Sequence, residues 1–163
     1  MTEYVCGFVF FRNYVALIRK ARPAWQAGRL NGIGGHIEVG ETAPVAMARE
    51  CCEETMGALN IPADEWTHFA TLSGDDYAWT HRTGADRDMF RVYFFYTELR
   101  NWPVPDPQDA TRDEPEPIRW YHVSTGEHHR ECLPNLFWLI PMAQAGVQCG
   151  HDFPYHIQER TPL

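Results

Sequence analysis

Apolar residues near the N-terminus form two short runs separated by polar residues. Residues 4–11 and 14–19 are rich in β-branched and aromatic side chains. Arg12 and Asn13 lie between these runs and can form a turn. Two such runs joined by a two-residue turn are typical of a β-hairpin, so the chain is expected to begin with two antiparallel strands.

A loop and then a helix are expected after the hairpin. Proline and glycine make residues 21–32 loop-like, and residues 33–37 are expected to be a short extended piece. From Thr42 onward the apolar residues recur at spacings of three and four, which favours an amphipathic helix. Thr42 is expected to cap the start of this helix, and Gly57 is expected to end it.

The second half of the chain is expected to add three strands and a second helix. The strands are predicted at 66–73, 89–97 and 118–123, and the helix at 134–145, with a kink or break at Pro141. The strand at 89–97 is so apolar that we expect it in the centre of the sheet. Residues 101–117 hold five prolines and are expected to form a loop, and the tail from residue 150 carries no clear pattern.

The order of these elements indicates one compact α/β domain over residues 1–163, since strands come before, between and after the two helices. The length of 163 residues suits one domain. No apolar run approaches the roughly 20 residues that cross a bilayer. The N-terminus also lacks the pattern of a signal peptide. We therefore expect a cytoplasmic protein that makes no contact with a membrane.

Charge and cysteine content narrow the classes of function. The formal net charge of −8 makes the chain a poor candidate for binding nucleic acid polymers. A small polyanion can still bind if a cation lies between it and the protein. The five cysteines show no CxxC spacing and are expected to be reduced thiols. Cys149 with His151, and the pair His128 and His129, stay open as metal ligands, although such residues in loops are usually structural.

Three glutamates of the predicted helix share one face. Glu50, Glu53 and Glu54 stand at i, i+3 and i+4, with Cβ atoms roughly 5–6 Å apart, so they repel one another. One interpretation is a solvated acidic face. The other is a site for a hard dication such as Mg²⁺, which binds a few carboxylates together with substrate phosphates. Glycines at 34 and 35 let the backbone approach a ligand closely, and a free carbonyl there could complete a metal shell.

The spacing around these glutamates is that of a known signature. Arg49 can pair with Glu41 and hold the preceding loop against the helix. Gly35, Glu41, Arg49, Glu50, Glu53 and Glu54 match Gly, five residues, Glu, seven residues, Arg-Glu, two residues, Glu-Glu. On these positions the chain is identified as a member of the Nudix (MutT-like) hydrolases. It departs from the family pattern at Met56, where a glycine is usual, while Gly57 follows one residue later.

The resemblance implies a fold, a reaction and roles for these residues. The fold is an α-β-α sandwich with a mixed central sheet and a catalytic loop-helix-loop. The reaction is hydrolysis of a nucleoside diphosphate linked to another group, with Mg²⁺, or Mn²⁺ in its place, as cofactor. By position, Glu50 and Glu54 are the strongest metal ligands, with the Gly35 carbonyl as a backbone ligand. Glu53 is a further ligand or the base that activates water, and Arg49 and Glu41 complete the catalytic set.

Residues outside the signature suggest where the substrate binds. The stretch 27–38 resembles the branch that hydrolyses oxidised purine nucleoside triphosphates, in which an Asn at the place of Asn31 contacts the base. The alternative is that Asn31 is only a turn residue, since Asn-Gly is a common turn pair. Lys20, Arg22 and Arg29 are candidates for phosphate contacts or are ordinary surface charges, and Gly34 is a candidate for a backbone contact.

A second candidate stretch precedes the strand at 118–123. Asp113, Glu114 and Glu116 lie where family members often carry acids near the base or the metals. Trp120 could stack on a base or pack in the core. Trp25 could cover a base or simply pack.

The resulting functional expectation is a Mg²⁺-dependent hydrolase of a nucleotide. A nucleoside triphosphate cleaved to monophosphate and pyrophosphate is the leading substrate. One alternative is a nucleotide-sugar or dinucleoside polyphosphate hydrolase, and another is a catalytically silent nucleotide-binding module. The expected partner is a small nucleotide, and a homodimer is left open.

Overall fold

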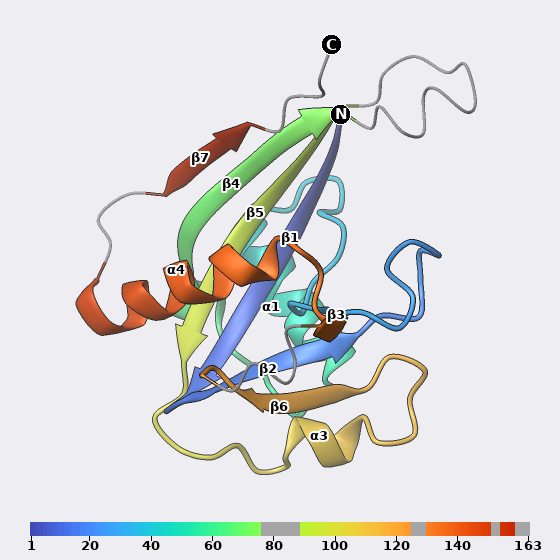
Figure 1. The fold of residues 1–163 in the computed structure, drawn as a ribbon, viewed down its shortest axis with the longest axis vertical. Coiled ribbons are helices and arrows are strands. Elements are labelled where there is room, and N and C mark those ends of the chain that lie inside the picture. The colour runs from blue at the N-terminus through green and yellow to red at the C-terminus, as the bar shows by residue number, and fades with distance from the viewer. Residues whose placement is uncertain (76–88, 125–129, 151–153, 159–163) are drawn as a thin grey trace.

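The chain forms a mixed β-sheet with helices on both faces (Figure 1). The computed structural model describes residues 1–75, 89–124, 130–150 and 154–158. The strands are β1 (Thr2–Phe11), β2 (Tyr14–Arg19), β3 (Leu30–Asn31), β4 (Thr67–Asp75), β5 (Met89–Glu98), β6 (Ile118–His122) and β7 (Tyr155–Gln158). The helices are α1 (Ala43–Glu54), η1 (Ala63–Glu65), α3 (Pro107–Ala110) and α4 (Leu136–Cys149). This architecture confirms the predicted α/β sandwich.

The sheet is built around two parallel strands. Its strand order is β3-β2-β1-β5-β4-β7, and β6 pairs with β2. Strands β1 and β5 are parallel along their length, whereas β1 with β2 and β4 with β5 are antiparallel. The predicted hairpin and the central position of the 89–97 segment are therefore confirmed.

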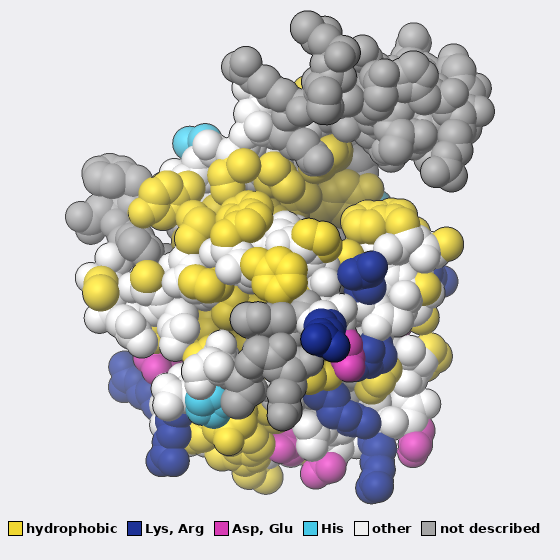
Figure 2. All heavy atoms as spheres, in the orientation of Figure 1, with side chains coloured by type: hydrophobic (Ala, Val, Ile, Leu, Met, Phe, Trp, Pro, Cys, Tyr) yellow, Lys and Arg dark blue, Asp and Glu magenta, His cyan; other side chains and the backbone are white. Residues whose placement is uncertain are grey.

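Both faces of β1 are buried, which explains its nearly continuous apolar sequence. Phe8 and Phe10 belong to the core under α4, while Val5 and Val9 belong to the core under α1. In Figure 1, α4 lies across the near face of the sheet and α1 lies behind it. Figure 2 shows apolar side chains over much of this near face, with basic side chains gathered below them.

Four short elements were not predicted: η1, which has three residues, and the three described next. Strand β3 lies inside the expected 21–32 loop, and β7 lies in the unassigned tail, where it pairs with β4. Helix α3 lies inside the expected 101–117 loop because Asp106 accepts a hydrogen bond from the Gln108 amide at 2.8 Å and Pro107 occupies the first turn. All three have two to four residues, so no hydrophobic period marks them in the sequence.

Of the two alternatives predicted at Pro141, a kink or a break, the break is wrong, because α4 continues through this residue to Cys149. Pro141 lies on the exposed side of α4, whereas Leu139, Ile140 and Ala143 are buried against the sheet. The buried contacts therefore hold the helix together although the proline removes one backbone donor.

The predicted start of α1 at Thr42 is confirmed, whereas its predicted end at Gly57 is wrong. Thr42 occupies the N-cap position but its side chain makes no capping hydrogen bond. The helix ends at Glu54, three residues before Gly57, because Met56 turns into the left-handed region with φ of 55°. The amide of Gly57 then donates to the Cys52 carbonyl at 2.7 Å. The family usually has glycine at the position of Met56, and glycine adopts this left-handed conformation without strain. Met56 adopts the same conformation with strain, because its Cβ crowds the backbone.

Replacing Met56 by glycine should stabilise the protein. The Met56 side chain is 62% exposed, so little packing is lost. The left-handed conformation costs a non-glycine residue about 1–2 kcal/mol, partly offset by the greater freedom of glycine in the unfolded chain. We expect Met56→Gly to raise the free energy of unfolding by about 0.5–1 kcal/mol in urea titrations. A loss of stability would contradict this reading of the helix end.

All five cysteines are free, as predicted for reduced thiols. Cys6, Cys51 and Cys132 are buried, and Cys149 is exposed on α4. Among the described residues, no helix is long and apolar enough to cross a membrane. His128, His129 and His151, considered above as metal ligands, lie outside the described residues.

Candidate functional site

Arg49 ties the loop before α1 to the helix, as predicted. Its Nε and Nη2 donate to the two carboxylate oxygens of Glu41 at 2.9 and 3.0 Å. Nη2 also donates to the His36 carbonyl at 2.9 Å, and the Glu38 amide donates to Glu41 at 3.0 Å. Hydrogen bonds from Arg49 and Glu38 hold the pKa of the Glu41 carboxyl below its usual range. The pair therefore fixes the path of the loop that leads from Gly35 to the helix.

Glu50 lies directly against Gly35. Its carboxylate oxygen accepts from Arg49 Nη1 at 2.9 Å, and its side chain is only 14% exposed. A Cβ atom built on Gly35 would fall 2.5 Å from Glu50 Oε1. Glycine at this position thus makes room for the carboxylate. The Gly35 carbonyl, expected to be free, accepts from the Val5 amide at 2.9 Å, which leaves one of its two lone pairs for a ligand.

Glu54, like Glu50, is a largely buried carboxylate of α1, with 17% of its side chain exposed. One oxygen accepts from the Gly34 amide at 2.8 Å, and the other lies 3.1 Å from Lys20 Nζ. Burial raises the pKa of the Glu54 carboxyl to about 7, although Lys20 and the Gly34 amide act in the opposite direction. Glu50 and Glu54 therefore converge on the two consecutive glycines 34 and 35.

Glu53 differs from its two neighbours because it faces solvent. Its side chain is 62% exposed, and one oxygen accepts from Arg49 Nη1 at 3.1 Å. Of the three glutamates, Glu53 is the one most accessible to solvent.

Lys20 links helix α1 to the segment that precedes β6. Its ammonium lies between Glu54 and Glu116, 2.7 Å from a Glu116 carboxylate oxygen. The second oxygen of Glu116 accepts from the amides of Ala21 and Arg22 at 2.6 and 3.2 Å. Burial alone would raise the pKa of Glu116, but these hydrogen bonds and the Lys20 charge lower it.

Asn31 and Arg29, two of the candidates for substrate contacts, are held by hydrogen bonds to other parts of the chain. The Asn31 amide accepts from the Gly32 amide at 2.9 Å and donates to Gln26 at 3.4 Å. Arg29 donates to the Cys132 carbonyl at 3.5 Å. Leu30 and Cys132 form an isolated β-bridge, so the Asn31 segment lies beside the start of the α4 region.

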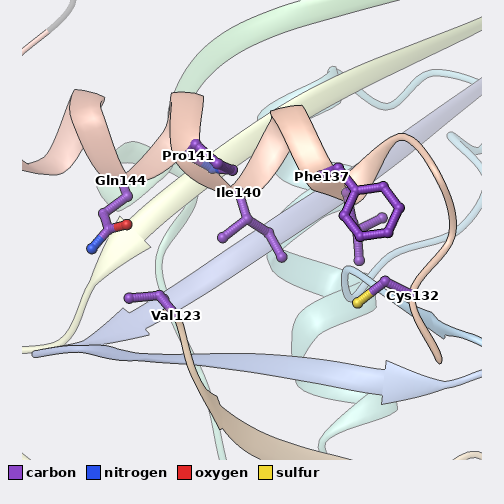
Figure 3. A pocket seen from close by; sticks show the side chains of 7 residues that line it. Val123, Cys132, Phe137, Ile140, Pro141 and Gln144 are labelled. Carbon is purple, nitrogen blue, oxygen red and sulfur yellow. The ribbon is translucent and has the colours of Figure 1, made fainter. Parts of the chain in front are cut away.

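A small cavity opens on the face of the sheet that α4 covers. Figure 3 shows its lining around α4 and the end of β6, with Val123 and Ile140 facing one another and Gln144 at one end. Its volume is about 130 Å³ and its walls are mostly apolar. Cys132 connects this cavity to the Asn31 segment through the bridge to Leu30.

Trp120 packs against the core on the α1 side of the sheet, but among the described hydrogen bonds its partner is not a glutamate of α1. Trp120 Nε1 donates to Asp106 at 3.2 Å, and its ring centroid lies 5.1 Å from that of Trp102. The interpretation of Trp120 as a packing residue is the one that these contacts favour. Asp113 and Glu114 are exposed, and within the described part of the chain no hydrogen bond or ion pair joins their side chains to the site. Trp25 is 69% exposed.

The arrangement of carboxylates fits a hard dication. Carboxylate and carbonyl oxygens are the donors that Mg²⁺ prefers, and Glu50, Glu54 and the Gly35 carbonyl offer three from neighbouring positions. Within the described ranges, no three acidic, His or Cys side chains are already gathered as a metal cluster. Arg49 and Lys20 instead hold the carboxylates as ion pairs.

The Lys20–Glu116 contact was missed from the sequence, although a signal for it exists. Strands β2 and β6 are antiparallel with Ile18 opposite Ile118. Extending this register by two residues places Lys20 opposite Glu116, as cross-strand neighbours. The pairing requires the register of two strands about 100 residues apart, which hydrophobic patterns alone do not supply.

Gly35→Ala tests the close approach of Glu50. The new methyl group would displace a side-chain carboxylate rather than backbone, so we expect only a small loss of stability, about 1 kcal/mol or less. Displacing Glu50 should weaken divalent binding and lower turnover by about 10–100-fold. The measurement is a Mn²⁺ titration beside thermal unfolding. Unchanged Mn²⁺ affinity in the folded variant would contradict the placement of Glu50.

Comparison with known proteins identifies a matching family and several solved structures with a similar fold. The family model described as NUDIX domain matches residues 3–135. A solved MutT structure described for Aliivibrio salmonicida and Vibrio cholerae is 17% identical, with a TM-score of 0.56, covering 90% of this chain and 96% of that chain. The NUDIX domain of Shewanella oneidensis NrtR, complexed with ADP ribose, is 12% identical, with a TM-score of 0.61 and coverages of 89% and 87%.

A third similar structure is larger than this chain. It is a bifunctional NMN adenylyltransferase/ADP ribose pyrophosphatase from Francisella tularensis, complexed with AMP and a Mn ion, at 17% identity and a TM-score of 0.56. The match covers 91% of this chain and 42% of that one. No curated protein matches the chain. At these identities the structural likeness concerns the fold.

Proposed function

The chain belongs to the NUDIX domain family and is a hydrolase of pyrophosphate bonds, and from that premise we propose that it cleaves a nucleoside triphosphate, ordinary or oxidised, to monophosphate and pyrophosphate with Mg²⁺ as cofactor. The observation that carries the proposal is the convergence of Glu50 and Glu54 on Gly34 and Gly35. Two carboxylates held at a glycine turn suit a dication that meets a diphosphate.

The metal ligands proposed are Glu50, Glu54 and the Gly35 carbonyl, with Mn²⁺ able to replace Mg²⁺. When bound, the dication polarises phosphorus–oxygen bonds and neutralises charge that develops in the reaction. The Mn ion in the Francisella tularensis structure supports a divalent cofactor by fold analogy alone. Arg49 keeps both Glu41 and Glu50 in place, so we assign it a positioning role.

Glu53 is proposed to accept a proton from the attacking water. It is the exposed member of the triplet, and Arg49 orients it from one side. A general base must lie within hydrogen-bond reach of the water, and a carboxylate between a metal site and solvent meets that requirement. Lys20 and Arg29 are proposed to contact phosphate oxygens, and the Gly34 amide to help hold the site.

The nucleobase is proposed to lie on the α4 side of the sheet, beside Asn31. An amide side chain both donates and accepts, so it can read the edge of a base. The apolar cavity near Cys132 and Gln144 is too small for a whole nucleotide, but it lies next to this segment and could take part of one. The contacts of Trp120 within its own packing argue against base stacking there.

Proton release on metal binding is expected from the raised pKa of Glu54. The carboxyl has a pKa of about 7 when folded, above its ordinary value of 4.5. The metal-free protein therefore binds more protons than the unfolded chain between these values, and this residue makes it less stable as pH rises. A metal ligand must be ionised, so Mg²⁺ binding at pH 6 should release about one proton, and almost none at pH 8.5.

Calorimetric titration with Mg²⁺ in two buffers of different ionisation enthalpy measures this proton. In Glu54→Gln the release should disappear. Equal proton release from wild type and Glu54→Gln would contradict the assignment of Glu54 as a metal ligand.

A substrate panel tests the reaction. The protein is incubated with ordinary and oxidised nucleoside triphosphates, ADP-ribose, nucleotide sugars and dinucleoside polyphosphates, each with Mg²⁺ and with chelator, and products are identified. We expect the highest kcat/KM for a triphosphate, with pyrophosphate as product. Preference for a nucleotide sugar or a dinucleoside polyphosphate would instead support the alternative hydrolase.

The remaining alternative, a silent nucleotide-binding module, is the outcome if nothing in the panel is cleaved. The complete set of Arg49, Glu50, Glu53 and Glu54 argues against it, since a binding module need not keep carboxylates that repel one another. A cytoplasmic location stays a prediction.

A further inference from the structure

Lys20 is the only lysine in the chain. The other 13 of the 14 basic residues are arginines, and they are spread over the whole sequence. Lysine is a compact point charge on a flexible stem, whereas arginine presents a rigid planar fork. The one lysine lies at the carboxylate site, beside Glu54. The question is therefore what an ammonium can do there that a guanidinium cannot.

The Lys20 ammonium is shared between two carboxylates that belong to different elements. It lies 3.1 Å from Glu54 on α1 and 2.7 Å from Glu116, which precedes β6. The three side chains are only 15%, 17% and 22% exposed. Burial alone would lower the pKa of Lys20, but the two carboxylates raise it, so the side chain stays charged.

Glu116 and the backbone of Lys20 are fixed to one another. Glu116 accepts from the amides of Ala21 and Arg22, the two residues after Lys20. The Lys20 amide donates to the Arg29 carbonyl at 2.9 Å, and its carbonyl accepts from Gly28 at 2.8 Å. Since both ends of this arrangement are held, the flexible Lys20 stem is the part that can move between Glu54 and Glu116.

A dication at Glu54 would conflict with the ammonium now bound there. A unit charge and a double charge about 5 Å apart repel one another even at an effective dielectric constant of about 20. The ammonium already lies closer to Glu116 than to Glu54, and Glu116 is held by a backbone amide. Glu116 can therefore keep the ammonium when a dication takes its place at Glu54, without a rearrangement of the chain.

We propose that Lys20 is an internal counter-ion: it neutralises Glu54 in the metal-free protein and moves toward Glu116 and the substrate phosphates when a dication binds. Glu116 is then a positioning residue that acts through Lys20 and does not bind the metal. This inference rests on the proposed function, because it takes Glu54 as a metal ligand. Lysine suits the role because a point charge can change partners without the paired geometry that an arginine fork requires.

A lysine-specific isotope label reports on this movement directly. Full-length protein made with lysine labelled at Cε and Nζ should give one side-chain signal, since the chain has one lysine. We expect Mg²⁺ alone to shift this signal, and inorganic pyrophosphate added with Mg²⁺ to shift it further. Sodium chloride at matched ionic strength is the control and should leave it nearly unchanged.

Mn²⁺ affinity in four proteins separates the roles of Lys20 and Glu116. The proteins are wild type, Lys20→Met, Glu116→Gln and the double variant, and free Mn²⁺ is counted by electron paramagnetic resonance. Loss of the competing ammonium should tighten Mn²⁺ binding by about tenfold or more. Glu116→Gln should weaken it several-fold in wild type, where Lys20 loses its second partner, but less than twofold in the Lys20→Met background.

Arg22→Met is the matched control. It removes the same charge from the same segment, and among the described contacts the Arg22 side chain pairs with neither carboxylate. We expect less than a twofold change in its Mn²⁺ affinity. An equal tightening in Arg22→Met and Lys20→Met would reduce the effect to net charge and overturn the proposal.

The outcomes distinguish this inference from the function on which it rests. Mn²⁺ binding by wild type with an unmoved lysine signal, or with equal losses from Glu116→Gln in both backgrounds, overturns the counter-ion role and leaves the metal site standing. The second result would instead make Glu116 a metal ligand. Absence of Mn²⁺ binding in all variants overturns both.

Discussion

Replacement of Glu54 by glutamine is expected to lower turnover by about 10²–10⁴-fold in a protein that stays folded. Glutamine keeps an oxygen for the Gly34 amide, so the turn at the glycines retains a partner. Lys20 keeps its contact with Glu116. The neutral amide removes the charge that we propose holds the dication, so activity is expected to fall while packing changes little. Glu53→Gln is expected to cause a similar loss by removing the proposed base.

Glu65→Gln is the matched control for both variants. It removes one exposed carboxylate from η1 and should leave kcat within about twofold. The measurements are kcat and KM at saturating Mg²⁺, with far-ultraviolet circular dichroism and thermal unfolding for each variant. Near-normal rates in folded Glu53→Gln and Glu54→Gln proteins would refute the assignment of these glutamates.

Gly34→Ala is expected to cause the largest loss of stability. The φ angle of Gly34 is 149°, and a Cβ atom there would lie 2.2 Å from the Val5 carbonyl oxygen. The nearest atoms belong to the backbone of Val5 and Cys6, so strand β1 or the turn has to move. We expect a loss of about 3 kcal/mol or more in the free energy of unfolding, which approaches the whole stability of many domains.

Gly28→Ala separates strain from the steric clash. Gly28 also has a positive φ, of 78°, but no atom lies within 4 Å of the added methyl group. Its loss should be about 1 kcal/mol, from the left-handed conformation alone. Chemical denaturation of the three proteins gives the comparison. Similar losses in the two variants would show that Gly34 does not pack against β1 as described.

The strands that carry long apolar runs could be predicted from the sequence. Strands β1, β2, β5 and β6 have five to ten residues and β-branched or aromatic side chains. The β-hairpin and the central place of β5 follow from these runs. Elements of two to four residues, such as β3 and α3, depend on tertiary pairing or on a single cap, so no period reveals them.

The candidate site was predictable where its residues are close in sequence. The spacing from Gly35 to Glu54 gave the helix face and the Arg49–Glu41 pair, because helix geometry and one turn relate these residues. The contact of Lys20 with Glu116 depends on strand register. The bond from the Val5 amide to the Gly35 carbonyl and the Trp120 packing depend on long-range contacts. The left-handed conformation of Met56 was not predicted, although the glycine that is usual at this position in the family favours it.

The most direct test of a dication at α1 counts bound metal beside a substrate that cannot be cleaved. Wild type and a Glu50→Gln, Glu54→Gln double variant are titrated with Mn²⁺ in the presence of a nucleoside triphosphate whose α–β bridging oxygen is replaced by methylene, and free Mn²⁺ is read by electron paramagnetic resonance. We expect the wild type to take up at least one Mn²⁺ beyond that held by the nucleotide alone, and the double variant to take up none. Equal uptake by both proteins, or no extra uptake by either, would contradict a metal site formed by these carboxylates.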